Sequence, residues 1–131
     1  MSAGASYSAT DRLQSLFYFE ATPRPGVDLA TLEQAIKAEI TKLQSSPPTE
    51  AELARIKTQV VAQKIYQQDS LFYVGSEIGA LEAIGLSWHL RDEYVDHIKQ
   101  VTAEQVQAVA RKYLVDSAAT IAYLLPEEAQ R

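Results

Sequence analysis

The chain has 131 residues, a net charge of −5 and an ordinary composition, 47% hydrophobic and 22% charged. This balance is typical of one folded domain, and the acidic excess disfavours binding to nucleic acid, which needs clustered Lys and Arg. Because the chain has no cysteine, disulfides, cysteine-ligated zinc and thiol catalysis are excluded. No apolar run approaches the ~20 residues that a membrane-spanning helix needs.

The first predicted elements are two strands. Residues 13–21 (LQSLFYFEA) are rich in β-prone side chains and stop at the turn-forming stretch 22–26 (TPRPG). Large apolar groups on both faces predict a strand that is covered on both sides or lies against a partner. Residues 3–9 would supply the partner strand through a short hairpin turn at 10–12.

The next predicted element is an amphipathic helix that begins after Asp28, a good N-cap residue. Its apolar residues recur at spacings of three and four, which places them on one stripe: Leu29, Leu32, Ile36, Ile40 and Leu43. Glu33 and Lys37 form a favourable i,i+4 pair on the solvent side. The helix ends at residues 45–48 (SSPP).

A second helix is predicted to begin at Thr49, because Thr49 and Glu52 have the spacing of a capping box. Leu53, Ile56 and Val60 continue its apolar face, and the helical pattern extends as far as residue 84. Residues 69–70 are a candidate break. The sequence leaves open whether residues 50–84 form one bent helix or two.

Two shorter helices are predicted next. Residues 90–101 form the first, with Tyr94 and Ile98 facing inward. Thr102 and Gln105 form the capping box of the second. The apolar face of this second helix is expected to comprise Val106, Val109, Ala110 and Tyr113.

The last predicted element is a closing strand at residues 118–125 (AATIAYLL), stopped by Pro126. The sequence therefore predicts an α+β fold: a two-layer α/β sandwich with a small, mostly antiparallel sheet packed on four to five helices. The opening residues resemble the end of a strand placed behind a methionine. We therefore expect residues 1–131 to be a single partial domain of a longer chain, with 127–131 as a tail.

Three residues of one predicted helix are of the types that bind metal ions. His89, Glu93 and His97 fall at i, i+4 and i+8 on a predicted helix. Eight helical residues separate the two histidines by about 12 Å along the axis and about 80° around it. Zinc–nitrogen bonds are only about 2.0–2.1 Å long, so one ion cannot readily bind both imidazoles. We interpret this group as a helix face with a His–Glu contact.

Other catalytic groupings have simpler explanations. Ser87, His89 and Asp92 could be drawn as a triad, but neighbours in sequence seldom assemble into one, and Ser87 suits a helix cap. Helix dipoles and solubility explain the paired carboxylates, which are Glu50 with Glu52, Asp92 with Glu93, and Glu127 with Glu128. No catalytic, cofactor-binding or metal-binding residue is assigned to this chain.

The aromatic residues are expected to lie mostly in the core, although aromatic side chains also serve at interfaces. The set comprises Phe17, Tyr18, Phe19, Phe72, Tyr73 and Trp88.

Four stretches form an ordered pattern: 15–28 (SLFYFEATPRPGVD), 35–40 (AIKAEI), 48–57 (PTEAELARIK) and 94–114 (YVDHIKQVTAEQVQAVARKYL). Their order and spacing resemble the C-terminal part of a non-zinc-binding domain in the insulinase/pitrilysin-type (inverzincin) zinc peptidases. The second helix start is similar to the family's T-x-x-E-L-x-x-x-K. The last stretch is similar to its V-T-x-E-D-V ending, with Gln105 where an acid is commoner.

The resemblance covers about residues 13–126 and implies a clamshell of homologous α/β domains. One domain of such a protein carries zinc on an H-x-x-E-H motif with a distal Glu. A facing domain without zinc helps to enclose an extended peptide. The resemblance therefore implies zinc in the parent protein or a partner domain, and none in this chain, which lacks H-x-x-E-H.

The family's facing domain also contributes an Arg followed by a Tyr to the active site. Here Tyr7 precedes the first arginine, Arg12. Because the order is reversed, the pair is not assigned to these two residues.

The resemblance favours a non-catalytic scaffold and chamber wall in a peptide-hydrolysing zinc metalloendopeptidase. Its partners would be the remaining domains of the same polypeptide or an active subunit. Two alternatives stay open: a catalytically inactive family subunit or assembly domain, and an unrelated helical interaction domain. The isolated chain is expected to self-associate through an exposed sheet edge. The peptide substrate, the activity of the parent and the compartment stay open, with a periplasmic or envelope parent suggested only by loose family association.

Overall fold

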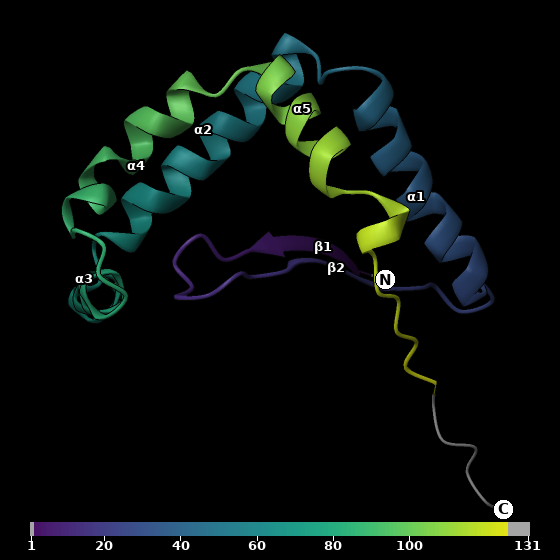
Figure 1. The fold of residues 1–131 in the computed structure, drawn as a ribbon, viewed down its shortest axis with the longest axis horizontal. Helices are drawn as coiled ribbons and strands as arrows, with labels where there is room; N and C mark the ends of the chain where they lie inside the picture. Colours follow the sequence, from purple (N-terminus) through teal and green to yellow (C-terminus); the bar gives the residue numbers. More distant parts are fainter. Residues whose placement is uncertain (1, 126–131) are drawn as a thin grey trace, which may run out of the picture.

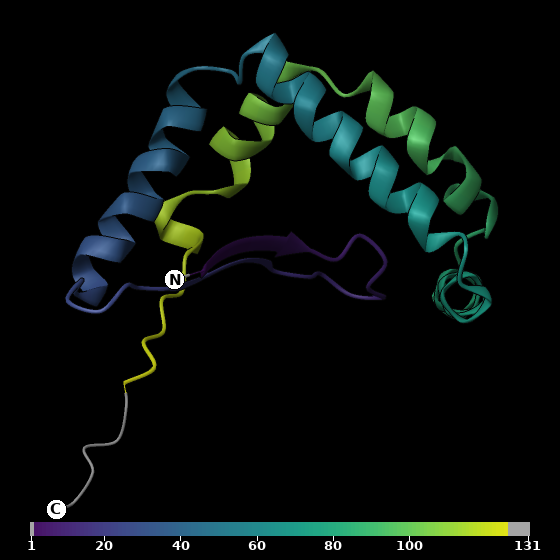
Figure 2. The ribbon, with the colours of Figure 1, turned by 180° about the vertical axis from the view of Figure 1, so that it is seen from behind.

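The computed structural model describes residues 2–125, which form one hairpin followed by five α-helices (Figure 1). The helices make an arch, with α1 and α5 in one limb and α2 and α4 in the other. The hairpin lies across the open side of the arch in both the front and the back view (Figures 1 and 2). The predicted α+β class, a small antiparallel sheet combined with a helical layer, is confirmed.

The hairpin pairs β1 (Ser2–Tyr7) with β2 (Phe17–Thr22) in antiparallel register, with Tyr7 opposite Phe17. The predicted pairing is confirmed, but β2 begins four residues later than expected. The connection spans residues 8–16, and the Ser15 hydroxyl closes it by donating to the Ser8 carbonyl at 2.8 Å. This longer loop replaces the short turn expected at 10–12.

Apolar and polar side chains alternate across the hairpin. Because neighbouring strand residues point to opposite faces, one face carries Ala3, Ala5, Tyr7, Phe17, Phe19 and Ala21. Ring contacts follow this face, with centroids 6.3 Å apart for Tyr7–Phe17 and 5.0 Å for Phe17–Phe19. Tyr18 lies on the other face with Glu20, where its hydroxyl can stay hydrated. Of the two arrangements expected for β2, a position against a partner strand is observed. Cover on both sides is not, since all three aromatic rings of β2 are exposed.

Helix α1 (Leu29–Ser45) begins as predicted. The Asp28 carboxylate accepts a hydrogen bond from the Thr31 amide at 2.6 Å, and Lys37 pairs with Glu33 at 2.6 Å. The predicted stripe of leucines and isoleucines is half-buried along one side of the helix.

Helix α1 packs against α5 (Ala103–Tyr113). The two helices satisfy each other's ends: the Gln44 amide donates to the Leu114 carbonyl at 2.6 Å, and Arg111 Nε donates to the Gln44 carbonyl at 2.5 Å. Such contacts provide partners for last-turn carbonyls, which have none within their own helix.

The apolar face predicted for α5 is wider than the face that the structure buries. Ala103 and Ala110 are buried, whereas Val109 and Tyr113 are exposed. Only a narrow stripe of α5 faces α1, and in residues 2–125 no second helix packs extensively against it. Both predicted capping boxes are confirmed, at Thr102–Gln105 for α5 and at Thr49–Glu52 for α2.

The sequence left open whether residues 50–84 form one bent helix or two. They form two helices, α2 (Glu50–Gln67) and α3 (Leu71–Ala83). They are separated by a turn, and the Ser70 hydroxyl caps α3 by accepting from the Tyr73 amide at 3.2 Å. Ile56, predicted on the apolar face of α2, is exposed.

Replacing Thr49 by alanine is expected to destabilise the protein by about 1 kcal/mol. The Thr49 hydroxyl accepts from the Glu52 amide at 3.3 Å, and this acceptor would be lost. Thr58→Ala is the matched control, because Thr58 lies inside α2 and bonds only its own helix, at Ala54. Urea unfolding followed by circular dichroism measures both, and equal losses for the two variants would contradict the capping role.

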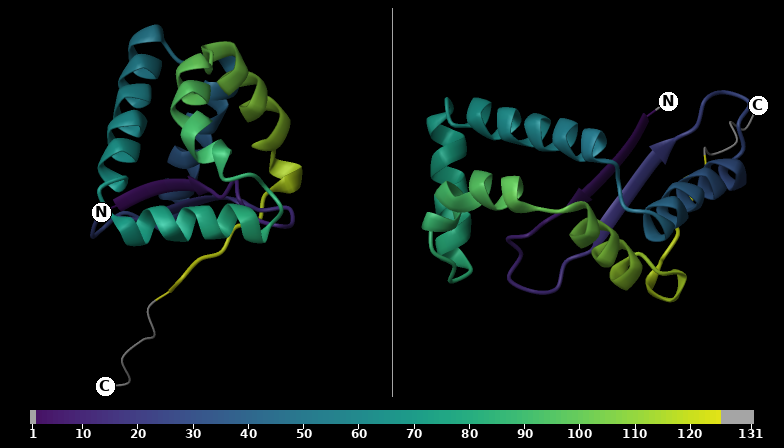
Figure 3. Two further views of the ribbon diagram at one scale, coloured as in Figure 1. Left: turned by 90° about the vertical axis from the view of Figure 1, so that its left-hand side faces the viewer. Right: turned by 90° about the horizontal axis from the view of Figure 1, so that it is seen from above.

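Helix α4 (His89–Gln100) packs along α2, and Lys57 Nζ donates to the Lys99 carbonyl at 2.8 Å. Ile98 is half-buried as predicted, but the neighbouring half-buried position is Val95 rather than Tyr94. Helix α3 runs across the ends of α2 and α4, as the view from above shows (Figure 3).

The predicted closing strand at 118–125 is wrong. A single 3-10 turn (Asp116–Ala118) is followed by residues 119–125, which form no strand. A β-prone segment needs a neighbouring strand to pair with, and the segment instead bonds α1, where the Tyr123 hydroxyl donates to the Glu33 carboxylate. The predicted stop at Pro126 and the tail at 127–131 lie outside the described residues.

Little of the described chain is buried. Leu81, Ala103 and Ala110 are its buried apolar residues, and the six aromatic residues predicted to be mostly core are all exposed. The chain exposes 10,732 Å², against roughly 6,900 Å² for a compact monomer of this mass. These rings are exposed because nothing in the described part of the chain packs over them. None of the helices within 2–125 is long and apolar enough to cross a membrane.

Candidate functional site

The two histidines lie at opposite ends of α4. His89 is its first residue and His97 lies in its last turn, so their backbones are separated by about 12 Å along the helix. His97 Nε2 is 4.0 Å from Glu93 Oε2, and the His89 ring lies on the Trp88 ring with centroids 3.8 Å apart. Among residues 2–125, no three or more His, Asp or Glu side chains are grouped so as to hold a metal ion. The side chains that the structure describes therefore do not fit a zinc site.

Ser87, His89 and Asp92, the possible catalytic triad at the start of α4, make other contacts. The Ser87 hydroxyl accepts from the His89 backbone amide at 3.3 Å, and Asp92 pairs with Arg91 at 2.8 Å. Ser87 thus supports the helix start. An open hollow at this α3–α4 connection is lined by Glu82, Gly85, Leu86, Ser87, Trp88 and His89.

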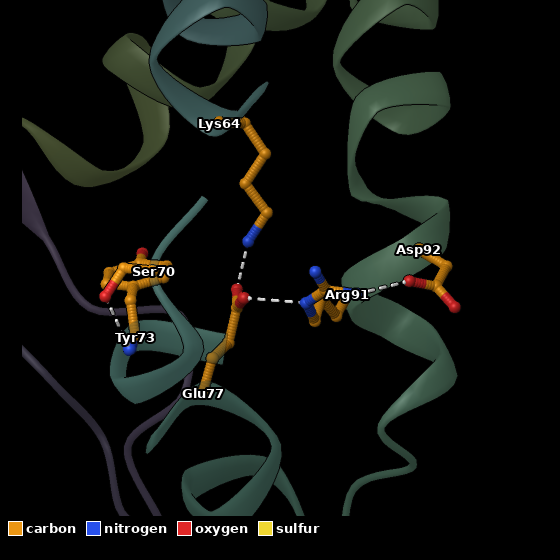
Figure 4. Close-up of polar contacts among 6 residues, drawn as sticks. All are labelled: Lys64, Ser70, Tyr73, Glu77, Arg91 and Asp92. Atoms are coloured by element: carbon orange, nitrogen blue, oxygen red, sulfur yellow. Dashed lines mark hydrogen bonds and ion pairs between the residues drawn. The ribbon is translucent and has the colours of Figure 1, made fainter. Parts of the chain in front are cut away.

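A cluster of charges that the sequence analysis missed joins three helices (Figure 4). The Glu77 carboxylate of α3 pairs with Lys64 of α2 and lies 3.2 Å from Arg91 Nε of α4. The sequence does carry one sign of this cluster. Lys64 lies four residues after Val60, at a position of the helical stripe where an apolar residue is expected.

A second cluster ties the end of the described chain to α1. The hydrogen bond from Lys37, followed by the one from Tyr123, lowers the pKa of Glu33. The same carboxylate raises the pKa of Lys37 and the pKa of Tyr123. These exposed contacts hold the segment at 119–125 beside the helix and suggest no catalytic chemistry.

The protein is expected to lose stability in acid. Hydrogen bonds from Thr31 lower the pKa of Asp28 from 3.8, and hydrogen bonds from Thr49 lower the pKa of Glu52 from 4.5. A carboxylate with a lowered pKa stabilises the fold above its unfolded-state pKa, and this stabilisation is lost as the pH falls through the folded-state pKa. The loss should therefore begin near pH 4.5 and continue below pH 3.8.

Glu52→Gln tests this dependence, because an amide oxygen can still accept from Thr49 but does not titrate in this range. Urea unfolding at pH 7 and pH 3 should show a smaller acid-induced loss for Glu52→Gln than for the wild type. Glu50→Gln, on the same turn but without the capping bonds, serves as the control. Equal losses for the wild type and Glu52→Gln would contradict the prediction.

Residues 1–60 match the family model described as the peptidase M16 inactive domain. Residues 1–60 are thus similar to part of an M16 inactive domain. The predicted resemblance to the insulinase/pitrilysin-type zinc peptidases, in an inactive domain of that family, is thereby confirmed. No curated protein matches the chain.

Two solved structures are similar to this chain over most of its length. A candidate zinc protease from Bordetella pertussis Tohama I is similar with a TM-score of 0.74 and 26% identity over 86% of this chain. The inactive peptidase domain of a candidate zinc protease from Bordetella parapertussis is similar with a TM-score of 0.74 and 25% identity over 98% of it. The chain spans 62% and 69% of those two chains, respectively.

Proposed function

We propose that this chain is a non-catalytic part of a zinc metallopeptidase, serving as scaffold and as one wall of a chamber that encloses a peptide. The match of residues 1–60 to an inactive M16 domain carries this proposal. The separation of His89 and His97 along α4 supports it. Zinc and the catalytic base would come from other domains of the same polypeptide or from a partner subunit.

The exposed surface supports a role within a larger assembly. The chain exposes roughly 3,800 Å² more than a compact monomer of its mass. A standard protein interface buries only about 800 Å² per partner. The surplus area therefore suits an extensive contact with further domains.

A peptidase assay tests the non-catalytic role. The purified chain is incubated with quenched fluorescent peptides, with added Zn²⁺ and then with chelator. No hydrolysis is expected from the chain alone. Addition of an M16 domain that carries H-x-x-E-H is expected to produce chelator-sensitive hydrolysis that depends on this chain. Chelator-sensitive hydrolysis by the chain alone would overturn the proposal, with His89→Ala and His97→Ala showing whether its own imidazoles are responsible.

The isolated chain is also proposed to self-associate through its hairpin. Both strand edges are unpaired within residues 2–125, and unpaired edges pair with other chains. The exposed rings of Phe17 and Phe19 on the apolar face would pack between the paired copies. Light scattering should report dimers or larger species. Phe19→Ser, on the apolar face, should shift them toward monomer, whereas Tyr18→Ser, on the opposite face, should not. A clean monomer across a wide concentration range would contradict self-association.

A further inference from the structure

The outward side of α3 carries no charged residue. The helical repeat of 3.6 residues places six exposed residues on the side opposite the buried Leu81, and we call them the outer face of α3: Phe72, Gly75, Ser76, Gly79, Ala80 and Ala83. Both charged residues of α3 are engaged with other helices. Glu77 pairs with Lys64, whose side chain is only 7% exposed (Figure 4), and Glu82 accepts from the Trp88 amide at 3.0 Å. A surface helix normally has its charged residues on the side that faces water.

The outer face has no partner within residues 2–125. Helix α3 lies at the tip of the limb formed by α2 and α4 (Figures 1 and 3), and no helix packs along it as α4 packs along α2. Phe72 is 85% exposed, and Leu71 beside it is 90% exposed. An uncharged face with such exposed apolar side chains is typical of a surface that binds a partner.

Two glycines on the outer face indicate what kind of partner fits. Glycine weakens a helix interior relative to alanine. A Cβ placed on Gly75 or on Gly79 would meet nothing within 4 Å, so alanine would fit at both positions of the described structure. Small residues four apart allow the backbone of another helix to approach closely. The two glycines therefore suit a second helix that lies against the outer face.

We propose that the outer face of α3 binds the outer face of α3 in a second copy of this chain, with the two helices antiparallel. The face is bulky at its first residue, Phe72, and small at its last, Ala83. In an antiparallel pair each Phe72 lies over Ala83 of the other copy, and each Ser76 lies opposite Gly79. A parallel pair would place ring against ring and leave a gap between the small residues.

Charge and size also fit this contact. Each copy has a net charge of −5, so two copies meet best where neither surface is charged. Helix α3 is about 20 Å long and alone covers less than the roughly 800 Å² per partner of a standard interface. We therefore expect a weak dimer whose population rises with concentration. This contact is separate from the hairpin contact proposed above, and the chain with both contacts should form species larger than dimers.

Sedimentation velocity over a concentration series tests the contact. Every variant carries Phe19→Ser, which removes the hairpin contact. Phe19→Ser alone should leave concentration-dependent dimers. Gly79→Leu should weaken this dimerisation about tenfold or more, because the added side chain keeps the two backbones apart. Ala54→Leu, the same kind of change at an exposed position of α2, should leave dimerisation unchanged.

Disulfide cross-linking tests the direction of the pair, since the chain has no cysteine of its own. In the antiparallel pair the two copies of residue 76 are about 4–5 Å apart along the helix axis, and the two copies of residue 83 are about 16 Å apart. A disulfide needs Cα atoms within about 7 Å. Oxidation should therefore cross-link Ser76→Cys and leave Ala83→Cys monomeric, whereas a parallel pair would cross-link both.

Three results would overturn the proposal. If Phe19→Ser is monomeric at every concentration, α3 does not bind a second copy, and the hairpin contact is unaffected by that result. If Gly79→Leu dimerises as strongly as Ala54→Leu, the contact lies elsewhere. Equal cross-linking at positions 76 and 83 rejects the antiparallel arrangement. If Gly79→Leu does not fold, Ser76→Cys, which changes one atom, decides the matter, and no cross-link there rejects the contact.

Discussion

Replacing Leu81 by alanine is expected to lower the free energy of unfolding by about 2–5 kcal/mol, the range seen for leucine truncation in cores. Leu81 is only 4% exposed and is the largest of the buried apolar side chains in the described structure. Because so few apolar residues are buried, other core side chains cannot repack to fill the cavity that truncation of Leu81 leaves. Urea unfolding followed by circular dichroism measures the change.

Leu71→Ala is the matched control for this prediction. It removes the same atoms from the same helix, but Leu71 is 90% exposed. Its effect on the free energy of unfolding should stay within about 0.5 kcal/mol. Equal losses for Leu81→Ala and Leu71→Ala would show that burial at Leu81 does not stabilise the isolated chain.

The second large effect is expected for Lys64→Met, which keeps an unbranched apolar stem of similar length but removes the charge. Removing one member of a buried ion pair typically costs about 3–5 kcal/mol, because the remaining charge loses its partner. Arg91 still faces Glu77 in this variant, so we expect about 3 kcal/mol, the lower end of that range.

Lys42→Met provides the comparison for Lys64→Met. Lys42 pairs with Glu39 at 3.8 Å on an exposed surface of α1, where ion pairs contribute little. Its replacement should change the free energy of unfolding by less than about 1 kcal/mol. A loss for Lys64→Met no larger than that for Lys42→Met would contradict a stabilising role of the buried charge.

The sequence predicted those features that depend on neighbouring residues. The N-cap at Asp28 and the capping boxes at Thr49 and Thr102 are local hydrogen bonds between residues three apart, and all three are present. The order of the hairpin and helices followed from the same local patterns. The family resemblance also came from ordered short motifs, which is why it agrees with the match over residues 1–60.

Features that depend on distant partners could not be predicted. A β-prone run such as 118–125 becomes a strand only beside another strand, and none is adjacent in the described structure. Val109 and Tyr113 have helical spacing, but their burial depends on a second packing surface. The ion cluster of Lys64, Glu77 and Arg91 joins three helices, and no local pattern in the sequence shows how these helices are arranged. The assignment of no site residue to this chain stays a prediction.

The mutual capping of α1 and α5 has a consequence for the order in which the molecule folds. The hydrogen bond between Gln44 and Leu114 joins residues that are 70 positions apart in the chain. The two strands of the hairpin, in contrast, are joined by the connection 8–16. Contacts between distant residues form slowly, because a long loop must first be closed. During synthesis α1 leaves the ribosome well before α5 exists, and its apolar stripe is unshielded throughout that interval. The limb formed by α1 and α5 is therefore expected to close after the hairpin and after the α2–α4 pair, in which Lys57 and Lys99 are 42 residues apart.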